Sequence, residues 1–129
     1  MEIIQKRFEI YKKIFIDFLL KYGSDRIRRY IFFKYIKHYN FEIRKGVYFD
    51  NLNKCKIGKN IFINYDCKFY TGYSKEDKNM IFLGENVYIG MNVIFICVSH
   101  LIGTEQKRAG KNVYKPIVVE QGSWIGGGV

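Results

Sequence analysis

One six-residue pattern occurs twice in succession in the segment Leu83-Gly84-Glu85-Asn86-Val87-Tyr88-Ile89-Gly90-Met91-Asn92-Val93-Ile94. Each unit opens with an aliphatic residue, continues with a glycine, and carries an asparagine fourth and a valine fifth. This period fits neither the turn of an α-helix nor the simple alternation of a strand. It is typical of short strands that meet at tight corners and wind into stacked turns around one continuous core.

The same pattern occurs on both sides of this stretch. Further units open at Ile57, Ile63, Phe69, Phe95, Val119 and Ile125. Three units make a turn of 18 residues, and Leu83 and Val119 are 36 positions apart. We therefore expect two full turns between these two residues, with the register kept throughout.

The fifth position of a unit is small or apolar, as in Ile61, Cys67, Val87, Val93, Ser99, Ser123 and Val129. We expect these side chains to share a narrow interior with the unit-opening residues. The asparagine in fourth position tolerates the left-handed backbone of a corner, and the glycine permits close approach of neighbouring turns. The chain is therefore predicted to be mainly β, a left-handed parallel β-helix of hexapeptide repeats. A β-sandwich that has this spacing by chance is the alternative.

We divide the chain into a basic helical N-terminal segment, residues 1–40, and a parallel β-helix domain, residues 41–129, with an imperfect first coil over 41–56. The predicted course then comprises a coil over 57–72, an outward loop over 73–80, a coil over 83–100, an excursion over 101–116 and a last coil from Val119. A long excursion from a compact repeat is usually functional.

The N-terminal segment has the pattern of two amphipathic helices. Apolar residues recur at intervals of three and four over residues 2–22, which predicts the first helix. Gly23 would end it, and Ser24-Asp25 would cap a second helix that runs to about Tyr39. Such basic helices could lie on an anionic membrane surface. We expect them instead to cover the open end of the β-helix, with His38 at the surface.

The formal net charge of the 129-residue sequence is +10, and residues 1–46 carry most of it, with 12 Lys/Arg against 5 Asp/Glu. A basic surface can attract nucleic acid, anionic lipid or a polyphosphate group. We expect a solvated basic face and no nucleic-acid partner. Three cysteines without a C-x-x-C pair predict neither a disulfide framework nor a metal site. The start does not read as a signal peptide and no long uncharged apolar run occurs, so we expect a cytoplasmic protein.

Several short motifs stand in a fixed order on this repeat. They are Phe62-Ile63-Asn64-Tyr65-Asp66-Cys67, Ser99-His100, Glu105, Arg108-Ala109-Gly110, Lys115-Pro116 and Trp124-Ile125-Gly126-Gly127-Gly128. With them, residues 41–129 resemble the maltose/galactoside O-acetyltransferase group of the hexapeptide-repeat acyltransferases. Residues 1–40 do not resemble the N-terminal region of that group.

The resemblance implies transfer of an acetyl group from acetyl-CoA to a sugar or glycan hydroxyl, in a homotrimer with sites between neighbouring β-helices. A hydroxyl is a poor nucleophile and needs a positioned base, a task that suits an imidazole and hence His100. Asn64 would bind the substrate or the oxyanion, and Glu105 would orient His100 or bind acceptor hydroxyls. A surface histidine, a turn asparagine and a solvated glutamate are the plainer interpretations. Because no cysteine lies nearby in the sequence, we expect direct attack.

The resemblance also implies a cofactor-binding wall. Trp124 and the glycines Gly126, Gly127 and Gly128 would line the pantetheine arm of acetyl-CoA, since glycines expose backbone groups to an extended amide chain. Arg108 would meet the phosphates or brace the loop. An aspartate of the group has no match at residues 69–72, which leaves the acceptor open. The group continues into further coils that this sequence lacks, so we expect a C-terminally truncated chain; a catalytically impaired or scaffolding β-helix is the alternative function.

Overall fold

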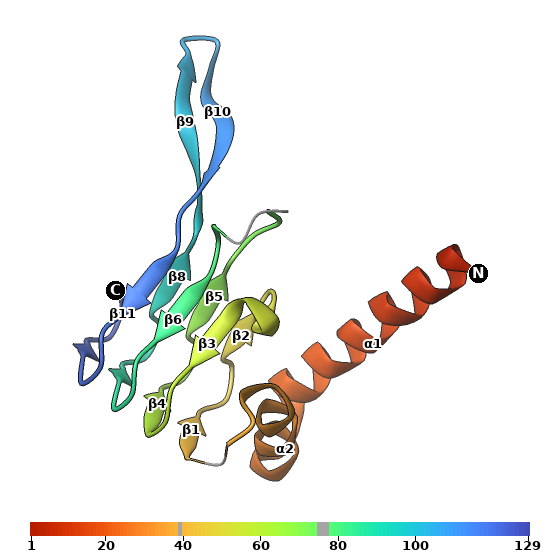
Figure 1. The fold of residues 1–129 in the computed structure, drawn as a ribbon, viewed down its shortest axis with the longest axis vertical. Coiled ribbons are helices and arrows are strands. Elements are labelled where there is room, and N and C mark those ends of the chain that lie inside the picture. The colour runs from red at the N-terminus through yellow and green to blue at the C-terminus, as the bar shows by residue number, and fades with distance from the viewer. Residues whose placement is uncertain (39, 75–77) are drawn as a thin grey trace.

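The computed structural model describes residues 1–38, 40–74 and 78–129. Figure 1 shows two helices that lead into a stack of short strands, from which one long hairpin projects. The described helices are α1 (Glu2–Tyr22), α2 (Asp25–Ile36) and the single 3-10 turn η1 (Leu52–Lys54).

Short strands make up the rest of the described chain. They are β1 (Phe41–Ile43), β2 (Tyr48–Phe49), β3 (Cys55–Ile57), β4 (Ile61–Ile63), β5 (Lys68–Tyr70), β6 (Ile81–Leu83), β7 (Tyr88–Ile89), β8 (Ile94–Ile96), β9 (Val98–Thr104), β10 (Lys107–Tyr114), β11 (Ile117–Val119) and β12 (Trp124–Ile125). Apart from β9 and β10, each strand is 2 or 3 residues long, as the six-residue period predicts.

The chain visits three parallel sheets in strict rotation. Sheet A has the order β1-β4-β7-β12, sheet B the order β2-β5-β8, and sheet C the order β3-β6-β11. One passage through the three sheets, here called a coil, therefore adds one strand to each of them. Every pairing within these sheets is parallel. The fold is β-rich with parallel sheets, and the predicted first coil over residues 41–56 is confirmed as β1, β2 and β3.

The unit-opening residues form continuous columns. Ile57 pairs with Leu83, which pairs with Val119 in turn. The predicted distance of two turns between Leu83 and Val119 is wrong, because the two residues lie on adjacent coils. The 36 positions hold one coil and an inserted segment of the same length. The unit-opening residues before and after the inserted segment nevertheless stay in the same register.

The interior is narrow and fully packed. Ile63, Phe69 and Ile89 have no exposed surface, and the rings of Phe49, Phe69 and Phe95 stack at 4.4 and 4.8 Å. The predicted interior position of Ser99 is wrong, because the chain leaves the coil at β9 and exposes Ser99. Val129 is also exposed.

The corners have the backbone that the asparagines predict. Asn60, Asn86 and Asn92 adopt φ values of 55°, 57° and 57°. Asn60 Nδ2 donates a hydrogen bond to Asn86 Oδ1 at 2.7 Å. Equivalent corners of successive coils are thus linked through their side chains as well as through the strands.

A buried polar cluster closes the corner between sheets B and C. Asp50 Oδ1 accepts hydrogen bonds from the backbone N and the Oγ1 of Thr71, and Asp50 Oδ2 accepts one from Gly72 N. The fully buried Asn79 donates to the carbonyls of Thr71 and Gly72 at 2.9 and 3.0 Å. Both ends of the predicted outward loop over 73–80 are thereby fixed, while its residues 75–77 lie outside the described part of the chain.

The two helices differ in how closely they pack against the first coil. Ser24 caps α2 as predicted, and α2 ends at Ile36, whereas the predicted end at Tyr39 lies outside the described residues. Phe32 of α2 is buried against Phe41 and Phe49, with ring centroids 6.4 and 5.7 Å apart. The prediction that the helices cover the end of the stack is therefore confirmed for α2.

Two expectations for this segment are wrong. Most of α1 is exposed, and its only buried residue is Leu20, so it covers little of the first coil. His38 follows α2 rather than lying within it, and it is half-buried, with Nε2 3.3 Å from the carbonyl oxygen of Ile57. No described helix is both long and apolar enough to cross a membrane.

We predict that Gly84→Ala destabilises the stack. A Cβ on residue 84 would lie 2.5 Å from the backbone N of Gln121 on the next coil, and backbone atoms there cannot move aside easily. We expect a loss of about 1–3 kcal/mol in the free energy of unfolding. The matched control is Gly126→Ala, which has the same place in its unit and no atom within 4 Å of the added Cβ. Urea unfolding followed by circular dichroism measures both, and equal stability of the two variants would contradict this packing.

Candidate functional site

The segment inserted between coils is an antiparallel hairpin. β9 pairs with β10, and the hairpin stands clear of the stack (Figure 1). It begins at Val98, earlier than the predicted excursion over 101–116. The prediction of a long excursion is confirmed, while its form as a regular hairpin was not foreseen.

His100 is exposed on β9 and pairs with Asn112 of β10. It lies within a strand of the hairpin rather than in one of the coils. Its Nδ1 lies 3.0 Å from the carbonyl oxygen of Gly110. The strand register is irregular between Ala109 and Asn112, and this bulge holds Gly110 opposite the ring.

This contact fixes the tautomer of the ring. A carbonyl oxygen can only accept a hydrogen bond, so Nδ1 of His100 carries the proton in the neutral ring. Nε2 then keeps its lone pair and can accept a proton from a hydroxyl group. The geometry supports a general base on an exposed strand. Sequence reasoning missed the role of Gly110, although the motif Arg108-Ala109-Gly110 contains it.

Glu105 lies at the tip of the hairpin, where its Oε1 accepts a hydrogen bond from Gln106 Nε2 at 2.9 Å. The group that orients His100 is the Gly110 carbonyl. Arg108 is exposed on β10, between the exposed Lys107 and the bulge, and the tip is therefore rich in cations. Such a tip can attract an anionic group such as a phosphate.

Asn64 lies elsewhere, at the corner after β4 of sheet A. Its Oδ1 accepts a hydrogen bond from Tyr65 N at 2.9 Å, a local contact typical of a turn asparagine. Its backbone N donates to the carbonyl of Ile89 on the next coil. Asn64 is half-buried, so part of the side chain can still reach a ligand.

Trp124 stands on the outer face of sheet A at the end of an aromatic column. It is 79% exposed and pairs in register with Tyr88, which pairs with Phe62. The rings of Phe62 and Tyr88 are stacked, with centroids 4.5 Å apart. The sequence could have shown this column, because these three residues all hold the sixth position of their units.

The predicted glycines follow Trp124. Gly126 has open space around it, Gly128 has a φ of 76°, and Gly128 N donates to the carbonyl of Met91 at 2.9 Å. Together with the aromatic column they form an open ledge on sheet A that an extended amide chain could follow.

One copy of the chain does not bring the predicted residues together. Asn64 and Trp124 belong to sheet A, whereas His100 belongs to the hairpin that leaves sheet B. In Figure 1 the hairpin projects at the top of the view and β4 lies near the bottom, on the opposite side of the stacked coils. The three residues therefore belong to two separate parts of the chain, the stacked coils and the hairpin.

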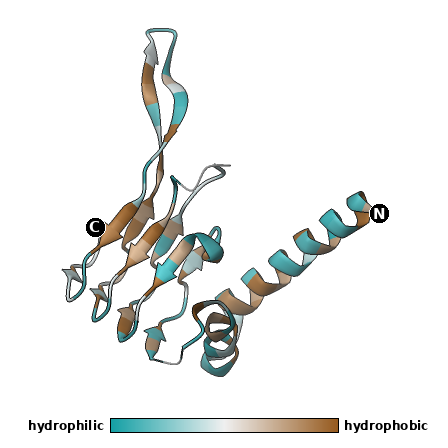
Figure 2. Cartoon of the chain, in the orientation of Figure 1, coloured by the Kyte–Doolittle hydropathy of each residue, from teal (hydrophilic) through white to brown (hydrophobic). Residues whose placement is uncertain are grey.

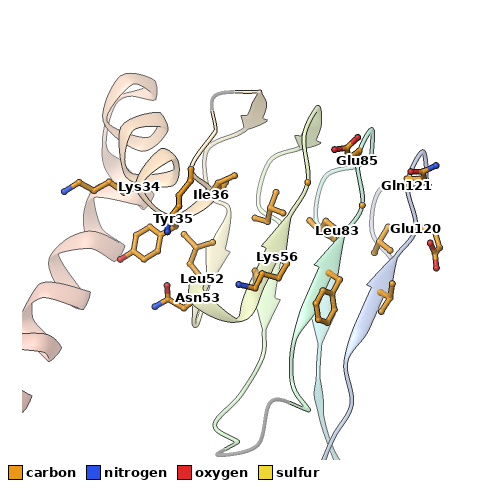
Figure 3. Close-up of a pocket in the computed structure, with 18 residues that line it drawn as sticks. Lys34, Tyr35, Ile36, Leu52, Asn53, Lys56, Leu83, Glu85, Glu120 and Gln121 are labelled. Atoms are coloured by element: carbon orange, nitrogen blue, oxygen red, sulfur yellow. The ribbon is translucent and has the colours of Figure 1, made fainter.

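The largest groove described lies away from all of these residues. It has a volume of about 1030 Å³ and runs along the outer face of sheet C, between the end of α2 and the corner residues Glu85 and Glu120 (Figure 3). It is lined by none of the predicted site residues. It is an open sheet face whose lining includes Glu85, Glu120 and Cys55 but no histidine, so His100 remains the candidate base.

The cysteines are not suited to covalent catalysis. Cys67 and Cys97 are buried in the core, and burial raises the pKa of both thiols. Burial, with smaller contributions from Asp50 and Cys97, raises the pKa of Cys55 to about 12. A protonated thiol is a weak nucleophile. In the described ranges no group of three His, Cys, Asp or Glu residues could hold a metal ion.

No family model matches the chain. It is 32% identical to a putative acetyltransferase of Schizosaccharomyces pombe over 68% of this chain and 40% of that protein. It is 30% identical to a putative acetyltransferase of Saccharomyces cerevisiae over 70% of this chain and 43% of that protein. It is also 30% identical to nodulation protein L of Rhizobium leguminosarum over 57% of this chain and 35% of that protein.

These similarities support a relationship to acyltransferases. The matched region spans less than half the length of each of these relatives.

We predict that the half-buried Cys55 makes the fold sensitive to alkali. The unfolded thiol ionises near pH 8.5, whereas the folded thiol stays protonated up to about pH 12. Above about pH 8.5 ionisation therefore favours only the unfolded chain, and the free energy of unfolding should fall by about 1 kcal/mol by pH 9.5. Urea titrations from neutral pH to pH 9.5 measure this, with Cys55→Ala as the control. The variant should show a flatter decline, and identical slopes would contradict the assignment.

Proposed function

We propose that the protein is a CoA-dependent O-acetyltransferase that moves an acetyl group from acetyl-CoA to a hydroxyl of a sugar or glycan. The observation that carries the proposal is the 3.0 Å contact of His100 Nδ1 with the Gly110 carbonyl oxygen, from which we infer that Nε2 can act as a base. The similarity to proteins named as putative acetyltransferases supports the reaction class. The sugar or glycan acceptor and the acetyl-CoA donor are proposed because the motifs in residues 41–129 resemble those of the maltose/galactoside O-acetyltransferase group.

In this proposal the acceptor is activated by His100. Nε2 takes the hydroxyl proton while the hydroxyl oxygen attacks the thioester carbonyl. The amide of Asn64 donates to the developing oxyanion. When the carbon–sulfur bond breaks, His100 returns the proton to the leaving sulfur, so the ring ends neutral. Direct attack agrees with the burial and raised pKa of the cysteines.

The proposal includes a homotrimer of left-handed parallel β-helices. Its support is the separation of His100 from the sheet A ledge in one copy. A neighbouring copy would present its Asn64, Trp124 and Gly126–Gly128 to the hairpin of the first. Arg108 would bind the phosphates of acetyl-CoA, and Glu105 would contact acceptor hydroxyls. A trimer would also cover apolar side chains on the outer sheet faces, such as Ile94 and Ile96, which are 47% and 55% exposed.

A scaffolding β-helix without catalysis is the second candidate. The observation that favours it is the same separation, because a chain that does not trimerise has no complete site. The two candidates differ in whether acetyl transfer depends on His100.

We predict that His100→Ala lowers kcat/KM for acetyl transfer by about 10²–10⁴-fold, because a general base contributes about that much. The matched control is His38→Gln at the other histidine of the chain, which contacts the Ile57 carbonyl and lies outside the proposed site. Release of CoA from acetyl-CoA in the presence of a panel of sugar acceptors measures the rates. Equal rates for His100→Ala and wild type would favour the scaffold.

We predict that His100→Ala and Trp124→Ala variants complement each other when mixed. Each is expected to be nearly inactive alone, since every site would lack one group. In randomly mixed trimers about a quarter of the sites would draw an intact hairpin and an intact ledge from different copies. Activity should therefore recover to about a quarter of wild type after co-refolding. No recovery in mixed trimers would contradict a site shared between copies.

A further inference from the structure

Helix α1 turns a side that carries Ile16, Leu19 and Leu20 together with charged residues toward the rest of the protein. Lys13 Nζ donates to the carbonyl oxygen of Asp50 at 2.7 Å. Glu9, Lys12 and Asp17 line the groove of about 510 Å³ between α1 and the first coil. The helix is held by a narrow contact around the buried Leu20.

The opposite side of α1 is apolar and exposed. Its residues recur at intervals of four and three, and we define the apolar face of α1 as Ile4, Phe8, Tyr11, Phe15, Phe18 and Tyr22. These side chains are 56–73% exposed. Figure 2 shows brown and teal residues alternating along the helix, as expected when one side is apolar and the other polar. A face of this size with no partner marks an interaction surface.

The charges beside the apolar face are all positive. Arg7 and Lys21 project from one margin of the apolar face, and Lys12 lies at the other margin, where the groove begins and where it pairs with Glu9 at 3.9 Å. Glu9 and Asp17 line the charged groove instead, and Asp17 also lines a hollow beside Phe18 and Lys21. A partner for the apolar face must therefore combine an apolar interior with negative charge at its edge.

We propose that α1 lies in the plane of an anionic lipid surface. The apolar face enters the boundary between headgroups and acyl chains, and Arg7 and Lys21 extend to anionic headgroups. The two tyrosines of the face suit this boundary, because their rings are apolar and their hydroxyls polar. The helix lies on the membrane without crossing it, in keeping with the hydropathy of the described helices.

A second copy of α1 suits the face less well. In a parallel or antiparallel helix pair, residues at the margins of the seam face one another. The margins carry Arg7, Lys12 and Lys21, so like charges would meet in either arrangement. Lipid headgroups provide the opposite charge and remove this repulsion. The proposal does not depend on the acetyltransferase function.

The test uses the whole chain and sedimentation with vesicles. One set contains phosphatidylcholine alone, and the other also contains phosphatidylserine. We expect wild type to bind the second set at physiological salt and to bind more weakly as the salt concentration rises. Phe8→Glu, on the apolar face, should bind at least tenfold more weakly than Gln5→Glu, which makes the same charge change on the polar side of α1.

Arg7→Gln with Lys21→Gln should abolish the preference for phosphatidylserine. Circular dichroism of each variant checks the fold, which these exposed positions should leave intact. Failure of wild type to bind phosphatidylserine vesicles, or equal binding by Phe8→Glu and Gln5→Glu, overturns the proposal. Concentration-dependent self-association that Phe8→Glu removes, without any lipid binding, would also overturn it and assign the apolar face to a second copy.

Discussion

The structure depends on the in-register stacking of coils across corners where no side chain fits. Gly58, Gly84 and Gly90 each lie so close to the next coil that an added Cβ would come within 2.9 Å of its backbone. This approach allows Ile63 to pair with Ile89, and Ile89 with Ile125, in one column. The distance between successive coils also determines where the β9–β10 hairpin, the aromatic column and helix α2 lie on the stack.

The parts of the fold that depend on local or periodic signals could be predicted from the sequence. The left-handed corners follow from asparagines at fixed positions, and the start of α2 follows from Ser24. The hairpin could not be predicted from the period alone. An insertion as long as one coil leaves the phase unchanged, so Ser99 was assigned to the interior although it lies on an exposed strand.

The candidate site, too, could be predicted from the sequence only in part. The sequence identified His100 through its neighbours, and the exposed ring agrees with that choice. Its partner Gly110 acts through a backbone carbonyl, which the bulge in β10 places opposite the ring. Because every residue has a backbone carbonyl, the residue type at position 110 does not reveal this role. The half-buried position of His38 and the cluster around Asp50 were missed for a related reason. Both depend on contacts between residues 19 or more positions apart.

All irregular segments of the stack leave it at the same edge. The 3-10 turn η1, residues 71–80 and the β9–β10 hairpin each connect a strand of sheet B to the next strand of sheet C. The connections at the other two edges are short, and each has glycine, asparagine or, at Asp66, aspartate in the left-handed backbone. Evolution can therefore lengthen, shorten or replace segments along this one edge while the strand register stays unchanged. New binding surfaces can arise there at little risk to folding.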